Sequence, residues 1–140
     1  MSERKIKALG EIALRVNDLD LMQEFYEKVI GLELIQRFPK AAFFKVAEGY
    51  AGHTQIVALF DRKEQTGFQG LSAAQTTVDH FAFTIALSDY EAEKRRLEAL
   101  GLKVSVAEHT WVQWRSLYVR DPEGNEVELV CYDPTAATNR

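Results

Sequence analysis

The order of hydrophobic and polar positions predicts a series of secondary-structure elements that occurs twice along the chain. In the first half, an apolar strand over residues 9–16 leads into a helix that Asp18 can cap and Gly31 can end. Apolar residues recur along that helix at the spacing of a single face, which indicates packing on a sheet: Leu21, Met22, Phe25, Tyr26, Val29 and Ile30. Three strands are predicted next, over residues 32–38, 41–47 and 53–60.

The same order returns after a polar linking loop over residues 61–76. A strand is predicted over 78–86, followed by a helix that starts with a capping box of Ser88 and Glu91 and ends at Gly101. Strands are predicted over 102–107, 113–119 and 126–132, with a tight turn at 121–125 between the last two. The pattern therefore predicts an internal repeat with an offset of about 70 residues.

This repeat predicts an α+β fold in which two βαβββ modules form a curved mixed sheet around a central cleft. Module 1 covers about residues 9–60 and module 2 about residues 77–133, within one domain that spans residues 1–140. Two such modules related by pseudo-twofold symmetry would place equivalent strands around one cleft.

Composition narrows the classes of protein that the chain can belong to. With 46% hydrophobic residues, the chain can fill a globular core. Its net charge of −4 argues against nucleic acid as the main partner, because phosphate binding needs a basic surface. No apolar run approaches the length of a membrane span, and no secretory signal is visible, so we expect a cytoplasmic protein. The lone Cys131 excludes an internal disulfide and a cysteine zinc cluster, and it is expected to be a small buried residue.

Strand alternation gathers polar side chains on particular faces of the predicted sheets. Glu11 and Arg15 share a face of the first strand, His80 opens its counterpart, and Glu128 lies on the last strand. Symmetry makes positions 11, 58, 80 and 128 equivalent, although Ala58 cannot coordinate anything. One imidazole and two carboxylates suit Zn, Ni, Mn, Fe or Co, and three protein ligands leave positions open for substrate. A divalent cation would also relieve the repulsion between the carboxylates of Glu11 and Glu128 in a mostly apolar cleft.

Each of these residues also has an ordinary structural interpretation. Glu11 could form a salt bridge with Arg15, His80 could be a hydrogen-bonded core histidine, and Glu128 could be an exposed strand glutamate. Their joint placement at symmetric positions is what favours a metal site. His109 falls in a predicted loop.

Four stretches of the sequence resemble the vicinal oxygen chelate superfamily: LGEIALRVNDL, FYEKVIGL, DHFAF and DPEGNEVEL. This superfamily includes glyoxalase I, fosfomycin-resistance thiol transferases, extradiol dioxygenases, methylmalonyl-CoA epimerase and bleomycin-binding proteins. The resemblance implies metal ligation by Glu11, His80 and Glu128, substrate binding by Arg15 and Tyr118, and a homodimer.

The expected function is that of a divalent-metal-dependent enzyme acting on a small substrate with adjacent oxygens, as a lyase, isomerase or thiol transferase. Glu128 and Glu11 are its candidate catalytic residues. Oxidative ring cleavage is disfavoured, because Glu11 stands where the resemblance implies a histidine. The alternative is a metal-free protein that binds an antibiotic or another small molecule, as bleomycin-resistance relatives do. Neither nucleic acid nor a membrane is an expected partner.

Overall fold

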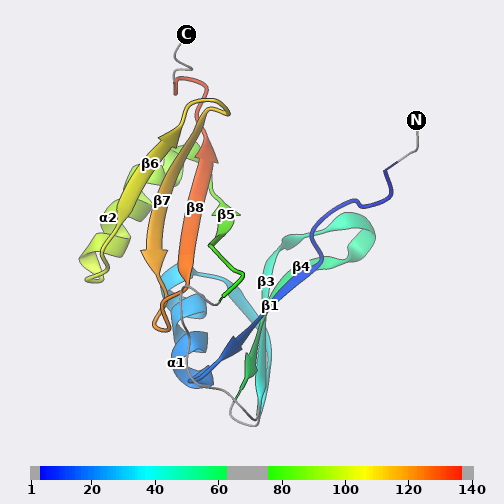
Figure 1. Ribbon diagram of the computed structural model, residues 1–140. Coiled ribbons are helices and arrows are strands. Elements are labelled where there is room, and N and C mark those ends of the chain that lie inside the picture. The colour runs from blue at the N-terminus through cyan, green and yellow to red at the C-terminus, as the bar shows by residue number, and fades with distance from the viewer. Residues whose placement is uncertain (1–3, 63–75, 137–140) are drawn as a thin grey trace. The chain divides into compact units, whose positions relative to one another are not determined.

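The computed structural model describes residues 4–62 and 76–136 (Figure 1). The chain divides into two compact units, residues 1–70 and 71–140. Within the described residues, no helix combines the length and the hydropathy that a membrane crossing requires.

The first unit holds a four-stranded mixed sheet with the strand order β1-β4-β3-β2. Strand β1 runs parallel to β4, and the other neighbouring pairs are antiparallel. Its elements are β1 (Glu11–Val16), α1 (Leu19–Glu24), the π-helical η1 (Phe25–Ile30), β2 (Glu33–Phe38), β3 (Ala41–Glu48), the 3-10 turn η2 (Tyr50–Gly52) and β4 (Thr54–Asp61).

The second unit repeats this topology with the strand order β5-β8-β7-β6. Strand β5 is parallel to β8, as β1 is to β4. Its elements are β5 (Phe81–Thr84), the 3-10 turn η3 (Leu87–Asp89), α2 (Tyr90–Ala99), β6 (Ser105–His109), β7 (Trp114–Arg120) and β8 (Glu126–Tyr132). The predicted α+β fold of two βαβββ modules is confirmed, and it takes the form of two four-stranded sheets.

One face of each sheet is buried against its helix. In the first unit, Leu14 and Val16 of β1 are buried, and so are Met22 of α1 and Phe44 of β3. The alternate side chains of β1, Glu11 and Arg15 among them, are exposed. The strand periodicity therefore separates a core face from a face that is available for function.

The helix ends follow the predicted signals only in part. Asp18 caps α1, since its side chain accepts a hydrogen bond from the Leu21 backbone N–H at 3.1 Å. Gly31 adopts φ of +94°, which only glycine tolerates readily. The predicted capping box in the second half was wrong: Ser88 lies in the 3-10 turn η3, and α2 starts at Tyr90. The chain tightens into that turn before the α-helix begins, so Ser88 is not at the N-cap position.

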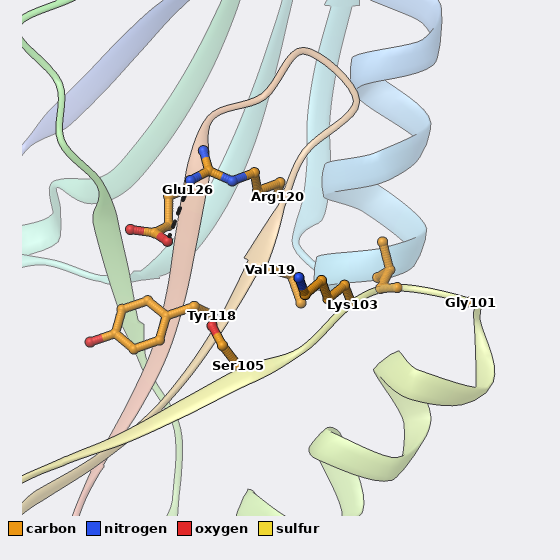
Figure 2. Close-up of a pocket in the computed structure, with 8 residues that line it drawn as sticks. Gly101, Lys103, Ser105, Tyr118, Val119, Arg120 and Glu126 are labelled. Carbon is orange, nitrogen blue, oxygen red and sulfur yellow. Dashed lines mark ion pairs between the residues drawn. The ribbon is translucent and has the colours of Figure 1, made fainter. Parts of the chain in front are cut away.

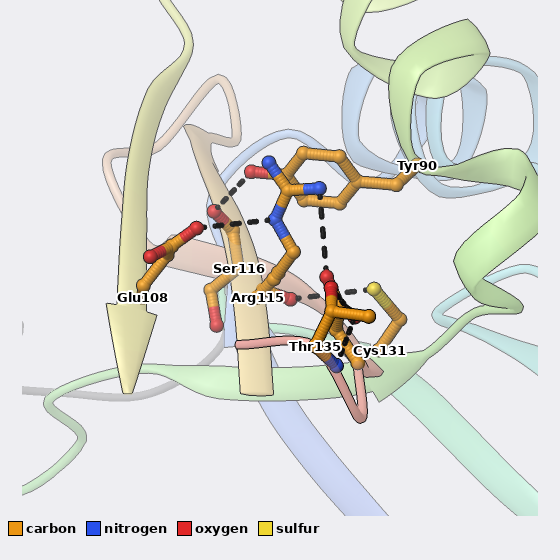
Figure 3. Close-up of polar contacts among 7 residues, drawn as sticks. Tyr90, Glu108, Arg115, Ser116, Cys131 and Thr135 are labelled. Carbon is orange, nitrogen blue, oxygen red and sulfur yellow. Dashed lines mark hydrogen bonds and ion pairs between the residues drawn. The ribbon is translucent and has the colours of Figure 1, made fainter. Parts of the chain in front are cut away.

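A cluster around Arg115 ties α2 to the second sheet (Figure 3). The Tyr90 hydroxyl donates to the backbone carbonyl of Ser116 at 3.0 Å, and the Arg115 guanidinium lies 4.6 Å from the Tyr90 ring centroid. Arg115 also lies 3.5 Å from Glu108. Cys131 is buried as predicted, and burial raises the pKa of its thiol, so this cysteine is a packing residue.

The predicted turn between β7 and β8 is confirmed. The Asp121 carboxylate accepts hydrogen bonds from the backbone N–H groups of Glu123 and Asn125, at 3.0 and 2.9 Å. This turn sets the register in which Tyr118 of β7 lies opposite Glu128 of β8.

Candidate metal and substrate site

The polar face of the second sheet carries the candidate chemistry. Glu126 and Glu128 alternate with buried apolar residues along β8, and Ser116, Tyr118 and Arg120 alternate in the same way along β7. The register pairs Tyr118 with Glu128 and Arg120 with Glu126. These side chains therefore share one face, opposite the apolar face on which Leu117 and Val119 are buried.

His80 lies directly before β5 and is placed between two carboxylates. Its Nε2 is 3.1 Å from Glu128 Oε1, and its Nδ1 is 2.6 Å from Asp79 Oδ1. The two partners differ sharply, since the Glu128 side chain is 6% exposed and that of Asp79 is 90% exposed. With Nδ1–H donating to Asp79, the arrangement suits either an imidazolium or a neutral imidazole with a cation between Nε2 and Glu128.

The charge state of His80 follows from the same contacts. The hydrogen bond with Asp79 raises the pKa of His80 above 6.5, and the negative charges of Glu128 and Asp79 add to this effect. Partial burial opposes the rise. Near neutral pH a proton therefore competes with any cation at Nε2.

Glu128 is held in place from its other oxygen. Ser116 is fully buried, and its hydroxyl donates to Glu128 Oε2 at 2.5 Å. A carboxylate with one oxygen on a serine and the other facing an imidazole is fixed in orientation before any ligand arrives, as metal sites require. The interpretations of Glu128 as an exposed strand residue and of His80 as a core histidine were therefore wrong: Glu128 is buried, and the His80 side chain is 39% exposed.

The donor atoms fit one divalent cation. Two ligand atoms that are each about 2.1 Å from an ion lie ~3.0 Å apart at an octahedral angle and ~3.4 Å apart at a tetrahedral angle. The 3.1 Å separation of His80 Nε2 and Glu128 Oε1 falls within this range, and it is also an ordinary distance for an ion pair. A second set of atoms lies close by, because Asp79, His80 and Glu126 each offer a ligand atom within 4.8 Å of the others.

Tyr118 borders this cluster. Its ring meets the His80 ring edge to face at a centroid distance of 6.1 Å, and its hydroxyl lies 3.0 Å from His109 Nε2. Burial raises the pKa of the Tyr118 phenol, so it remains a proton donor at neutral pH. The placement of His109 in a loop was wrong, because β6 extends to this residue and pairs it with Trp114 of β7.

Glu11 and Arg15 lie in the first unit, on the exposed face of β1. Within the described residues these two side chains form no ion pair with each other, so the structure does not contain the salt bridge considered from the sequence. Ala58 is fully buried and pairs with Ala13 of β1. The meeting of Glu11 with His80 and Glu128 at one ion stays a prediction.

The face of the first sheet that bears Glu11 is aromatic. Phe43 contacts Phe38 and Phe60 edge to face, at centroid distances of 5.9 and 5.7 Å. Phe38 and Phe60 are 49% and 40% exposed. These three rings form an apolar surface, which we name the aromatic stripe.

A pocket of about 440 Å³ opens beside Tyr118 in the second unit (Figure 2). Its lining comes from the α2–β6 connection, the start of β6, the end of β7 and the start of β8: Gly101, Leu102, Lys103, Ser105, Tyr118, Val119, Arg120 and Glu126. Three of these residues, Tyr118, Arg120 and Glu126, belong to the polar face of the sheet, so the pocket borders that face.

Sequence reasoning missed several members of this site. Asp79 and Ser116 received no role, although Asp79 adjoins His80 and Ser116 shares the face of Tyr118. Glu126 also received no role, although it lies two residues before Glu128 on the same predicted strand. The available signal was strand alternation on β7 together with the acidic neighbour of His80.

Comparison with known proteins identifies the class that this fold and site define. The profile of the Glyoxalase/Bleomycin resistance protein/Dioxygenase superfamily matches residues 8–129, so the chain belongs to this superfamily.

Three relatives illustrate its range. The chain is 27% identical over 124 residues to glutathione transferase FosA of Serratia marcescens, a match that covers 89% of this chain and 80% of that protein. It is 31% identical over 122 residues to biphenyl-2,3-diol 1,2-dioxygenase 3 of Rhodococcus globerulus, covering 86% of this chain and 61% of the dioxygenase. The chain is also similar to the crystal structure of lactoylglutathione lyase from Agrobacterium tumefaciens, with a TM-score of 0.66 and 30% sequence identity. That match covers 91% of this chain and 95% of the lyase chain.

Proposed function

We propose that this protein is a divalent-metal-dependent enzyme that acts on a small substrate with adjacent oxygens, as a lyase, isomerase or thiol transferase. The observation that carries the proposal is the placement of His80 Nε2 3.1 Å from Glu128 Oε1, with Asp79 on the other ring nitrogen. Two relatives, a glutathione transferase and a lactoylglutathione lyase, support the proposed reaction types.

In this proposal His80 and Glu128 hold the ion, and Glu11 supplies a third ligand. The ion, when bound, would polarise the paired substrate oxygens as a Lewis acid. Tyr118 keeps its phenol proton and can donate it to a substrate oxygen beside His80. Arg15 would bind a substrate carboxylate through its guanidinium. Glu11 and Glu128 are the carboxylates that could accept a proton from the substrate.

Metal analysis tests this proposal directly. The purified protein is loaded in turn with Zn, Mn, Fe, Ni and Co, dialysed, and analysed for bound metal alongside Glu128→Gln and Glu11→Gln. We expect about one ion per chain in the wild type and a large loss in both variants. Glu24→Gln, an exposed carboxylate on α1, is the matched control and should retain the metal. Equal metal content in the wild type and Glu128→Gln would refute the proposed site.

Glu126→Gln separates the two sets of donor atoms around His80. We favour His80 Nε2 and Glu128 as the ligands of the ion, because Glu128 is buried and oriented by Ser116. Asp79, in the other set, is almost fully exposed. Retention of metal in Glu126→Gln and its loss in Glu128→Gln would support that choice. The reverse pattern would move the ion to the Asp79 side of the ring.

We also propose that the chain forms a homodimer, since the superfamily resemblance implies one. Light scattering coupled to size-exclusion chromatography should give twice the chain mass of 15.9 kDa. A mass of one chain at micromolar concentration would contradict the proposal.

The aromatic stripe favours a second candidate function, metal-free binding of a planar ligand. Half-exposed Phe38 and Phe60 beside Phe43 offer ring faces for stacking. Fluorescence titration of metal-free protein with bleomycin would test it. Binding that Phe43→Leu weakens, in protein that retains no metal, would favour this function over the enzyme.

A further inference from the structure

The pocket beside Tyr118 carries an unusual set of charges for a protein with a net charge of −4. Two cationic side chains, Lys103 and Arg120, line it together with one carboxylate, Glu126 (Figure 2). The hydroxyl-bearing residues Ser105 and Tyr118 complete the polar part of the lining. The pocket therefore has a cationic excess and hydroxyl donors, a combination that suits an oxyanion.

Arg120 is positioned by its neighbours without being neutralised. Its Nη1 donates to the backbone carbonyl of Gly124 at 2.9 Å, and its Nη2 lies 3.9 Å from Glu126 Oε1. The latter distance is too long for a hydrogen bond, so the ion pair is loose. Lys103 forms no ion pair with any residue in the described part of the chain. Both cations are available to a ligand.

Glu126 links this pocket to the His80 cluster. Its carboxylate offers an atom within 4.8 Å of ligand atoms on Asp79 and His80. A divalent cation bound at this cluster would offset the negative charge of Glu126. The negative charge of Glu126 would then cancel less of the positive potential that Lys103 and Arg120 create in the pocket. An anion in the pocket would be attracted more strongly as a result.

We propose that this pocket binds an oxyanion group of the substrate, a carboxylate or a phosphate, through Lys103 and Arg120. This inference rests on the proposed function where it concerns the rest of the substrate: the adjacent oxygens lie at the His80–Glu128 pair, and the anionic group lies beyond Tyr118. The substrate class is a small molecule with paired oxygens at one end and an anionic group at the other. Metal and anion bind cooperatively, because a cation at the His80–Glu128 pair lies close enough to Glu126 to offset the negative charge of that carboxylate.

Sulfate and acetate are suitable probes of the pocket without knowledge of the substrate. Amide chemical shifts of the metal-free protein, kept in EDTA, are followed by NMR during titration with each salt at constant ionic strength. We expect saturable shifts at residues 101–105 and 118–120, and a loss of affinity of threefold or more in Lys103→Gln and in Arg120→Gln. The matched controls are Lys28→Gln and Arg95→Gln, which remove exposed cations elsewhere and should leave the affinity unchanged.

The titration is repeated with one equivalent of Zn²⁺, and the proposal predicts sulfate binding at least threefold tighter than in EDTA. Shifts that do not saturate, or that persist unchanged in Lys103→Gln and Arg120→Gln, would overturn the inference. Equal sulfate affinity with and without bound Zn²⁺ would overturn the cooperativity. The two proposals fail separately: loss of sulfate binding with normal Zn²⁺ uptake refutes only the pocket, and absent Zn²⁺ uptake with normal sulfate binding refutes only the metal site.

Discussion

Replacing Asp79 tests whether His80 is oriented for metal binding. In the structure the Asp79 carboxylate lies 2.6 Å from His80 Nδ1, so it holds the tautomer that leaves Nε2 facing Glu128. Asp79→Ala removes this acceptor completely. Asp79→Asn keeps an oxygen that can accept from Nδ1–H but removes the negative charge.

The expected magnitude follows from the exposure of Asp79. Removal of a carboxylate that orients a metal-binding histidine typically lowers the affinity for the metal by about 10–100-fold. The Asp79 side chain is 90% exposed, so solvent screens its charge and the lower end applies. We expect Asp79→Ala to weaken metal binding ~10-fold, about 1.4 kcal/mol, and Asp79→Asn to lose less because the hydrogen bond remains.

Isothermal titration calorimetry with Zn²⁺ at pH 8 is the appropriate assay. Asp79 raises the pKa of His80, so at lower pH its removal also reduces competition from protons. The loss in Asp79→Ala should therefore shrink between pH 8 and pH 6. Asp20→Ala is the matched control, since Asp20 is 85% exposed and pairs with Arg37 at 2.8 Å in the first unit. Unchanged affinity in Asp79→Ala at pH 8, or an equal loss in Asp20→Ala, would refute this account of His80.

Three further predictions concern stability. Tyr90→Phe leaves the Ser116 carbonyl without its 3.0 Å donor, so urea denaturation should show a loss of about 1–2 kcal/mol, and an unchanged midpoint would contradict this. Phe44→Ala opens a cavity at a fully buried position and should cost about 3–5 kcal/mol in the same assay. In metal-free protein, the raised pKa of His80 adds stability that is fully present below pH 6.5 and is lost as the pH rises through the folded-state pKa. His80→Gln should therefore flatten the pH dependence of unfolding in that window, and identical profiles would refute the contribution.

The composition of each strand face was readable from the sequence. The period-two alternation on β8 put Glu126 and Glu128 together, away from the buried Val127 and Leu129. The repeat with an offset of about 70 residues predicted two units of equal topology, which the parallel pairs β1–β4 and β5–β8 confirm. The alternation is a local feature, because it depends on the pleat of one strand, and the repeat is readable because the same order of elements recurs along the chain.

The contacts within the site depended on tertiary structure. Ser116 reaches Glu128 across β7 and β8, and His109 reaches Tyr118 across β6 and β7, only because the strands pair in one particular register. A slip of one residue would turn each of these side chains to the opposite face. Alternation within a strand says which residues share a face, whereas hydrogen bonding between strands decides which of them touch.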